Sequence, residues 1–493
     1  MRAFPVATFK NVPNAAPRPA ISNTKDDLDA LSRFTLGRWL WREQEQLACR
    51  YVKFELQELL DIAASVSSEG QYNKVLFLTM ANGCEIIAKL PNPNAGRPHF
   101  TTASEVATMD FLRNLLNLPV PRVYAWSSRA TGNPVSAVYI LIEKQPGVML
   151  SDAWDSLKGK QRAQLVLQVV DFEKTLAATK INGFGSFGKE VQSTKFAIGP
   201  TNHRTFFDFG RGSLDIDRGP WASTIEFMTA VAKREIATVA PYTLPENSAT
   251  HTSVLWHGDL NLQNIFVDPK EPTRILGIID WQSVSLFPLF TQATRPAFLE
   301  YNGPLPETLD KVRLPENFES LNPAEQQKAK ALHQAQTLHN LYLARSRQMN
   351  PVVFEAIQGQ KTLRHQVSVI PGLTIMDYEP CFNSLLRDIQ KEWRSIVGQK
   401  SDGTSSITCP LQFSADEVQE QERNEELWAQ GVRLMEEFTS DTGCFKHWDG
   451  RVNEQDYEPS RRQLDEGLER FLQREARSKE EQREWLEALP FVY

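Results

Sequence analysis

The sequence predicts an α+β fold in two lobes, a small antiparallel sheet followed by a mainly helical part. The β-rich runs 74–79 and 85–90 flank Asn82-Gly83, and Asn-Gly between two such runs is the strongest short-range hairpin signal. A further strand, almost wholly apolar, is predicted at 138–143. From residue 151 to about residue 250 the pattern is mainly helical, with an apolar centre at 165–170.

Composition limits the classes of function. A chain of 493 residues is long enough for about three domain-sized units, and its formal net charge of -7 opposes nucleic-acid binding, which needs a concentrated basic surface. The five cysteines are widely separated without a C-x-x-C pair, which indicates a reducing compartment and neither a disulfide framework nor a structural zinc site. No apolar run reaches the roughly 18 to 20 residues of a bilayer span, so we expect a soluble chain with no transmembrane segment.

The basic tail at 1–30 is compatible with two interpretations. Its first 25 residues carry four basic side chains, no acidic one and several Ser and Thr, as mitochondrial transit peptides do. Four prolines in the same stretch oppose the long amphipathic helix that such peptides form. A mitochondrial address and a plain N-terminal tail both stay open.

The following segments are interpreted in chain order. The aromatic residues of 31–51 are expected to pack in the core, and 54–60 has the pattern of an amphipathic helix. In the second strand of the hairpin, alternation places Ile87 and Lys89 on one face. A helix that begins near Thr102 places Glu105 on its apolar face. Because an unpaired buried carboxylate is costly, Lys89 is the expected partner of Glu105, unless both reach solvent at the edge of the sheet.

The strongest chemical signal lies at 257–264 and 278–281. Asp259 offers a carboxylate that can accept a proton from an attacking hydroxyl. Asn264 and Asp280 offer the hard oxygen ligands that Mg²⁺ takes when it neutralises phosphate oxygens. Each of these residues alone is equally compatible with a turn or a helix cap. Together, joined by the strand-like run 274–279, they predict phosphoryl transfer.

The same two motifs carry a family resemblance. The pattern H-x-D followed by Asn resembles the catalytic loop of protein kinases, and its form here, with Asp280-Trp281 in place of Asp-Phe-Gly, resembles the aminoglycoside phosphotransferase branch. Three stretches, 34–41, 88–91 and 102–109, resemble the fungal subgroup named for altered inheritance of mitochondria protein 9. The resemblance implies a two-lobed protein-kinase-like fold with a small antiparallel-sheet N-lobe and a mainly helical C-lobe.

The resemblance also implies roles for residues. ATP would be the phosphoryl donor and Mg²⁺ its metal. Lys89 would orient the phosphates, Glu105 would hold Lys89, and Ile87 would contact adenine. The hinge from Glu143 to Gln145 would read the adenine edge, and His257 would support the catalytic loop. Asp259 would be the base, with Asn264 and Asp280 as metal ligands.

Some features depart from that family. The phosphate loop at 69–74 has one glycine where protein kinases have three, which leaves its backbone contact with phosphate in doubt. A literal G-x-G-x-x-G at Gly183, Gly185 and Gly188 does not follow a strand, so we interpret it as a turn-rich loop. An Asp-Phe-Gly triplet at Asp208 precedes the catalytic loop instead of following it, and we exclude it from the metal site.

The domain plan assigns 1–30 to the tail, 31–143 to the N-lobe, 144–400 to the C-lobe and 401–493 to a charged helical extension. A proline-punctuated excursion is expected after Asp280, then helices at 323–347 and 381–396. The mixed charges of 415–492 indicate solvated helix faces, and we expect this segment to pack on the second lobe.

The functional prediction has two forms. The first is an ATP-dependent phosphotransferase that acts on a hydroxyl of an unidentified small molecule. The alternative is an ATP-binding pseudokinase or scaffold that acts through a protein partner in mitochondria; the weak glycine loop and the long extension favour it. The predicted location is mitochondrial, otherwise cytoplasmic.

Overall fold

The computed structural model describes most of the chain between residues 32 and 489. The described residues are 32–35, 37–55, 65–69, 72–79, 85–189, 196–207, 212, 214–231, 242–306, 308–369, 378–398, 404–445 and 449–489. The chain divides into two compact units. The first combines Met1–Thr102, Tyr124–Ile142 and Ala415–Tyr493, and the second combines Ala103–Val123 and Glu143–Ser414.

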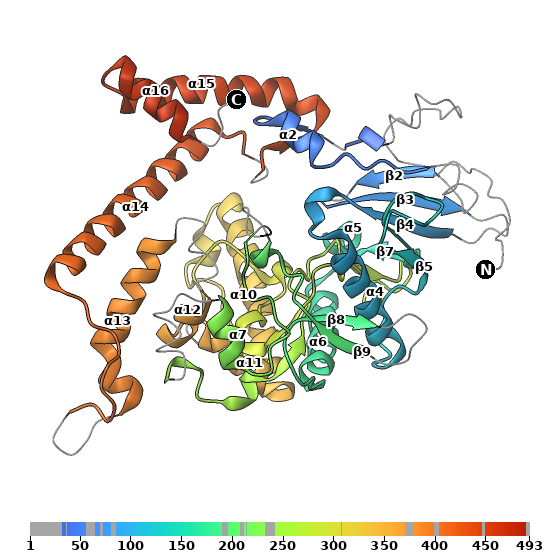
Figure 1. Ribbon diagram of the computed structural model, residues 1–493, viewed down its shortest axis with the longest axis horizontal. Coiled ribbons are helices and arrows are strands. Elements are labelled where there is room, and N and C mark those ends of the chain that lie inside the picture. Colours follow the sequence, from blue (N-terminus) through green and yellow to red (C-terminus); the bar gives the residue numbers. More distant parts are fainter. Residues whose placement is uncertain are drawn as a thin grey trace. The chain divides into compact units, whose positions relative to one another are not determined.

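The first unit contains a five-stranded sheet (Figure 1). Its order is β2-β3-β4-β6-β5, with β2 at Ser65–Glu69, β3 at Asn73–Thr79, β4 at Glu85–Pro91, β5 at Val123–Ser127 and β6 at Tyr139–Glu143. The pairing of β3 with β4 runs in register from Asn73 opposite Pro91 to Thr79 opposite Glu85. The predicted hairpin is therefore confirmed, and its Asn-Gly turn lies outside the described residues.

Alternation along the hairpin supplies the core of this unit. Leu76, Leu78, Ala88 and Leu90 are buried and pack with Leu141 of β6, as expected of a sheet with one covered face. After a 3-10 turn at Pro93–Ala95 (η1), helix α4 runs over Pro98–Asn114. It begins four residues before the predicted start, at a proline, which suits a first helical position. The amphipathic helix predicted at 54–60 lies mostly outside the described residues, and Phe54 and Glu55 are not helical.

The C-terminal segment packs within the first unit, so the expectation that it packs on the second lobe is wrong. It forms helices α14 (Ala415–Thr442), α15 (Tyr457–Glu475) and α16 (Lys479–Ala488), with a 3-10 turn η8 (Glu454–Asp456). Between α14 and α15, strand β14 (Arg451–Val452) pairs with β1 (Arg38–Trp39), which precedes helix α2 (Glu43–Ala48). The buried side chains of Leu40 and Trp41 join Phe438 and Phe471 in one cluster.

Polar contacts reinforce this union. Asp449 accepts hydrogen bonds from Trp39 Nε1 at 3.1 Å and from Arg50 Nη2 at 3.2 Å. The Arg50 and Asp449 side chains are only 4% and 6% exposed, so the ion pair is shielded from solvent. The Arg50 guanidinium also lies 4.4 Å from the Trp39 ring centroid. The extension is thus part of the folded first unit.

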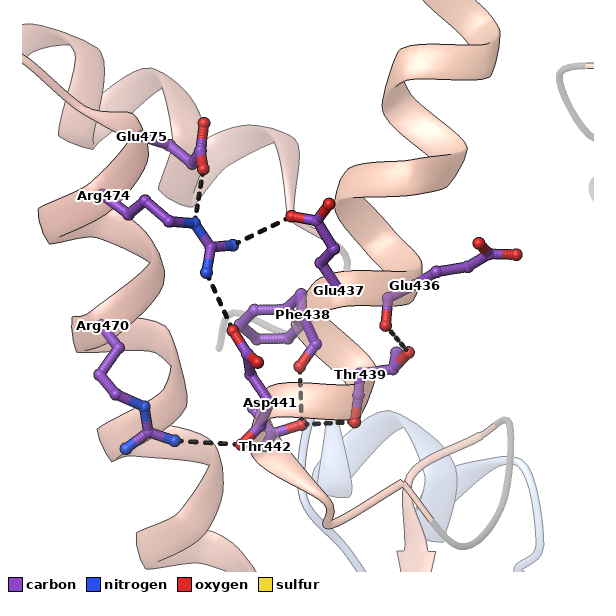
Figure 2. A network of polar contacts seen from close by, with 9 residues as sticks. All are labelled: Glu436, Glu437, Phe438, Thr439, Asp441, Thr442, Arg470, Arg474 and Glu475. Atoms are coloured by element: carbon purple, nitrogen blue, oxygen red, sulfur yellow. Dashed lines mark hydrogen bonds and ion pairs between the residues drawn. The ribbon is translucent and has the colours of Figure 1, made fainter.

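Helices α14 and α15 are joined by a surface network (Figure 2). The Arg474 guanidinium lies 2.9 Å from Asp441, 3.7 Å from Glu437 and 2.7 Å from Glu475. Arg470 Nη2 donates to the Asp441 carbonyl oxygen at 3.2 Å. Because the Arg474 side chain is 42% exposed, solvent screens these pairs, and the helices are held mainly by their apolar faces.

The second unit is mainly helical. Its helices are α5 (Leu150–Trp154), α6 (Gly159–Ala178), α7 (Thr224–Val231), α9 (Leu289–Gln292), α10 (Pro323–Met349), α11 (Pro351–Gly359), α12 (Leu363–Val369) and α13 (Glu379–Val397). The predicted helices at 323–347 and 381–396 are confirmed. The apolar centre of α6 packs in a large core with Tyr342 of α10 and Trp393 of α13.

Short strands complete this unit. A three-stranded sheet has the order β12-β11-β7, with β7 at Val148–Met149, β11 at Ile265–Val267 and β12 at Ile275–Ile278. Two further pairs are β10 (Ser253–Leu255) with β13 (Leu286–Pro288), and β8 (Ser186–Lys189) with β9 (Phe196–Gly199). Single 3-10 turns are η2 (Arg204–Phe206), η4 (Ser248–His251), η5 (Ala297–Leu299) and η6 (Phe318–Ser320).

The glycine triplet predicted as a loop is partly a strand. Gly188 lies in β8, and Gly185 forms a bridge with Leu286. The φ angle of Gly185 is +148°, and a Cβ atom there would lie 2.2 Å from a carbonyl oxygen of β9. Gly185 therefore permits the close approach of β9. The glycines also interrupt the helical pattern expected for 151–250. The Asp-Phe-Gly triplet at Asp208 lies outside the described residues.

No described helix combines the length and apolarity that a membrane crossing requires.

Candidate active site

The loop between β10 and β11 is fixed at its ends and in its middle. Both flanking strands are buried apart from Phe266, which is partly covered. Within the loop, the Leu260 carbonyl oxygen accepts from the Ala297 backbone N–H at 3.1 Å, and the Leu262 carbonyl oxygen accepts from the Ser151 N–H at 3.0 Å. Leu260 itself is buried. The loop is therefore a defined platform for the side chains between its anchoring residues.

Asn264 is hydrogen-bonded to Asp259, the predicted base. Its Nδ2 donates to the Asp259 backbone oxygen at 2.8 Å and to Oδ2 at 3.2 Å. An amide has one donor end and one acceptor end, so this arrangement commits the nitrogen and leaves Oδ1 as the group available to a metal. Asp259 is exposed, whereas Asn264 is only 8% exposed.

Asn261 is a site residue that the sequence analysis missed. Its Nδ2 donates to Asp259 Oδ1 at 2.9 Å, so each carboxylate oxygen of Asp259 has an amide donor. Its Oδ1 accepts from the backbone N–H of Gln263 at 2.8 Å and of Asn264 at 3.2 Å. An Asn that bonds the backbone two residues on is a recognised turn former, and its position two residues after Asp259 was the available signal.

Strand pairing brings the two predicted metal-ligating residues to neighbouring positions. Strands β11 and β12 are antiparallel, with Ile265 opposite Ile278. The Ile279 N–H donates to the Asn264 carbonyl oxygen at 3.0 Å, so Asp280 follows directly on a residue bonded to Asn264. Asp280 is exposed and has a φ angle of +66°. Asp tolerates this left-handed conformation better than most residues, and such strain gathers at functional sites.

His257 connects the loop to the end of β12. Its Nε2 lies 2.8 Å from the Ile279 carbonyl oxygen, which can only accept, so Nε2 carries the proton. The ring meets Trp281 edge-on at 4.7 Å between centroids. Burial lowers the pKa of His257, against the opposing effect of Asp280 and Asp259. A neutral His257 therefore bonds the start of the loop to the residue after β12, and its supporting role in catalysis stays a prediction.

The hinge residues have structural partners for their side chains. Glu143 Oε2 accepts from Arg113 Nη1 at 3.1 Å and from the Arg122 backbone N–H at 3.0 Å. Gln145 Nε2 donates to the Leu276 carbonyl oxygen of β12 at 2.9 Å. These contacts fix the segment 143–145, whose predicted contact with adenine runs through its backbone and stays a prediction.

Lys89, Ile87 and Glu105 lie on the predicted elements. Lys89 and Ile87 are in β4 of the first unit, where Lys89 is 8% exposed and Ile87 half-buried. Glu105 is in the part of α4 that belongs to the second unit and is 3% exposed. Two buried charges of opposite sign suit an ion pair, and their pairing stays a prediction.

The site suits magnesium better than a transition metal. Among the described residues, no three His, Cys, Asp or Glu side chains gather as a metal site. Asn264 Oδ1 and the Asp280 carboxylate are hard oxygen donors, and Mg²⁺ is usually held by one or two protein oxygens with waters and substrate phosphates completing the shell. The donor set fits that pattern.

Comparison with known proteins agrees with this chemistry. The profile of a family described as "Phosphotransferase enzyme family" matches residues 63–290, which include the loop and Asp280. The chain is 30% identical over 453 residues to a subtelomeric hrmA-associated cluster protein of Aspergillus fumigatus, a match that covers 75% of this chain and 85% of that protein.

Two more distant matches complete the comparison. Altered inheritance of mitochondria protein 9, mitochondrial, of Yarrowia lipolytica is 22% identical over 493 residues, with 82% of each chain covered. Among solved structures, the amicoumacin kinase hAmiN in complex with AMP-PNP is 14% identical, with a TM-score of 0.30; the match covers 67% of this chain and 89% of that one.

Proposed function

Because the chain belongs to the phosphotransferase enzyme family, we propose that it transfers the γ-phosphoryl group of ATP to a hydroxyl of a small molecule. The observation that carries this proposal is the hydrogen-bonded unit of Asp259, Asn264 and Ile279. It ties the base candidate to both metal-ligand candidates across two paired strands. A fixed geometry of this kind is what phosphoryl transfer, a reaction of positioning and charge neutralisation, requires.

Asp259 is the proposed base. Its carboxylate is exposed to solvent, and two amide groups orient it. A hydroxyl that approaches within hydrogen-bond range would pass its proton to this carboxylate as its oxygen bonds to the γ-phosphorus, while the bond from that phosphorus to the bridging oxygen of ATP breaks and ADP leaves. Asn261 keeps the carboxylate in place without supplying a proton of its own.

Asn264 and Asp280 are the proposed ligands of Mg²⁺, which when bound would neutralise the phosphate oxygens of ATP. On the first unit, Lys89 would orient the phosphates with Glu105 as its counter-charge, and Ile87 would contact the adenine. The backbone from Glu143 to Gln145 would read the adenine edge. His257 supports the loop from a neutral, buried position.

The first test is calorimetric titration of the full chain with ATP, with and without Mg²⁺. Binding should require the metal and should be lost in Asp280→Ala. Asp259→Asn should retain binding and lose turnover across a panel of hydroxylated metabolites. The matched control is Asp155→Asn, which neutralises an exposed carboxylate after α5. Unchanged turnover in Asp259→Asn would sink the assignment of the base.

The binding and turnover measurements together decide between the two forms of the functional prediction. ATP affinity without turnover on any acceptor would favour the binding module that acts through a protein partner. In that case, substitution of an exposed side chain of α14, such as Leu427→Ser, should abolish recovery of the partner and leave the first unit folded. Absence of ATP binding under all conditions would contradict both forms.

We further propose a mitochondrial location. Relatives named as mitochondrial cover 82% of this chain at 22% identity, and the basic tail has the composition of an import signal. Fusion of residues 1–30 to a fluorescent protein should direct it to mitochondria. A fusion that stays in the cytoplasm would count against the tail as the address.

A further inference from the structure

A small cavity in the second unit is lined by both basic and apolar side chains. Its volume is about 190 Å³, less than the roughly 300–1,000 Å³ of a whole ligand pocket. Its lining includes Arg295, His339 and Lys361 together with the apolar Leu309 and Phe354. A space of this size suits one polar group of a larger ligand.

Arg295 and His339, which both line the cavity, contact each other and keep further N–H groups as donors. Arg295 Nη1 lies 2.7 Å from His339 Nδ1. Burial, then the charges of Arg295 and Lys361, lowers the pKa of His339 to about 4, so at neutral pH the ring is uncharged and its Nδ1 accepts. The proton of the neutral ring is then on Nε2, a second donor. The guanidinium has five N–H groups, and most of them remain for another acceptor.

No acidic side chain of the described residues neutralises these cations. None of the described lining residues is Asp or Glu, and neither Arg295 nor Lys361 forms a salt bridge within the described part of the chain. Asp310 follows the lining residues Thr308 and Leu309 in the chain, and its carboxylate accepts from Thr308 Oγ1 at 2.8 Å. Glu307 lies outside the described residues.

A hydrogen bond joins the segment that contains Arg295 to the catalytic loop. Ala297, two residues after Arg295, donates its backbone N–H to the carbonyl oxygen of Leu260, the residue after Asp259. Through this hydrogen bond, the Cα atoms of Asp259 and Arg295 are at most about 18 Å apart. Gln360, beside Lys361, donates to the Ala293 carbonyl oxygen at 2.6 Å and holds the same segment from the other side.

We propose that this cavity binds an anionic oxygen group, phosphate or carboxylate, of the acceptor molecule. Arg295 would bind it through paired N–H groups, as guanidinium does with both anions, while Lys361 adds charge at the rim and Phe354 covers the adjoining apolar part. The proposal rests on the proposed phosphotransferase function and narrows its substrate class to hydroxyl compounds that already carry a negative group.

Binding is tested first without any turnover. Saturation-transfer NMR titrations of the full chain would use phenyl phosphate, benzoate, benzyl alcohol and benzylamine. The two anions should bind, and the neutral and cationic compounds should not. The ratio of the affinities for phenyl phosphate and benzoate shows whether the cavity prefers phosphate or carboxylate. Arg295→Gln should weaken anion binding about tenfold or more, as loss of a charge-assisted hydrogen bond does. Lys361→Gln should weaken it about twofold to fivefold, because its charge is exposed.

Controls separate this cavity from the nucleotide site and from general charge. Lys328→Gln removes one exposed charge from α10 away from the cavity and should leave binding unchanged. Saturating ATP and Mg²⁺ should also leave it unchanged. Anion binding that is lost when ATP and Mg²⁺ are added and is kept in Arg295→Gln would place the anion at the nucleotide site and overturn the proposal. Binding that appears only in Glu307→Gln would show that Glu307 already neutralises the cations, with the same consequence.

Turnover then tests the substrate class. With an anionic hydroxyl compound, Arg295→Gln should raise KM at least tenfold with a smaller change in kcat, and Arg295→Lys should restore part of the affinity. Efficient turnover of neutral or cationic acceptors, independent of Arg295, would overturn the inference and leave the phosphotransferase function intact. If the unmodified chain does not bind ATP in the presence of Mg²⁺, the proposed phosphotransferase function itself is contradicted.

Discussion

Glu173 makes the stability of the second unit depend on pH. Its side chain is 3% exposed, and Oε2 accepts from the Tyr342 hydroxyl at 2.7 Å. Burial raises the pKa of Glu173 from 4.5 to about 8, although the Tyr342 hydrogen bond lowers it. Between these values the folded state keeps a proton that the unfolded state has released. The free energy of unfolding must therefore fall as pH rises through this window.

The expected size follows from the shift. Each pH unit inside the window costs about 1.4 kcal/mol, so from pH 5.5 to pH 7.5 Glu173 should remove roughly 3 kcal/mol of stability. Glu173→Gln has nearly the same shape and cannot ionise. Across these two pH units, the free energy of unfolding of the variant should rise relative to that of the unmodified protein by the same amount. This difference should level off above about pH 8.

Urea unfolding followed by tryptophan fluorescence at pH 5.5, 6.5 and 7.5 measures this difference. Glu316→Gln, which changes an exposed glutamate of the same unit, is the control and should leave the pH dependence of the unmodified protein in place. If the difference between Glu173→Gln and the unmodified protein is the same at all three pH values, Glu173 does not retain a proton and the reasoning is refuted.

The remaining predictions concern single contacts and are read by urea unfolding unless stated otherwise. Arg50→Gln should destabilise the first unit by about 3–5 kcal/mol because it leaves a buried carboxylate unpaired, whereas Arg474→Gln in the exposed network of Figure 2 should cost less than about 1 kcal/mol; equal costs would contradict the role of burial. Gly147→Ala should cost about 2 kcal/mol or more, since a Cβ atom there lies 2.3 Å from a carbonyl oxygen of β11 and φ is +99°. Gly159→Ala, with no atom near its Cβ, should be neutral or stabilising by up to about 1 kcal/mol. Asn261→Ala should lower turnover about tenfold without changing Mg²⁺-dependent ATP binding, and unchanged turnover would remove Asn261 from the site.

The hairpin and the long helices could be predicted because their signals are local. Asn82-Gly83 selects a turn by backbone preference, and the spacing of apolar residues in α10 and α13 selects a helix. The predicted α+β fold is confirmed on these grounds. The loop at 257–264 could be predicted because its chemistry needs particular residues at short spacing. Asp280 lies near the end of this loop because strands β11 and β12, which follow the loop and precede Asp280, are adjacent and antiparallel.

What could not be predicted depends on distant partners. The amphipathic pattern of α14 and α15 shows that a face is buried, yet it does not say against what, so the segment was assigned to the wrong lobe. Strand β1 has two residues, too few for any periodicity, and its partner lies at β14. The cavity beside Arg295 joins residues from four separate segments, and nothing in the sequence near Arg295 signals it.

The first unit closes with residues from both ends of the described chain, and this has a consequence for its synthesis. Trp39 and its hydrogen-bond partner Asp449 are 410 residues apart. At roughly 5–20 residues per second on the ribosome, about 20–80 seconds pass between the emergence of the two. During that interval Trp39 and Trp41 lack the C-terminal residues that bury them in the folded protein. The helical unit, which ends at Ser414, is fully translated before Asp449 emerges. The pairing of β1 with β14 and the apolar cluster around Trp41 thus form only after the helical unit has been made, so a chaperone that shields Trp39 and Trp41 would have to remain bound until Asp449 and helix α15 have been translated.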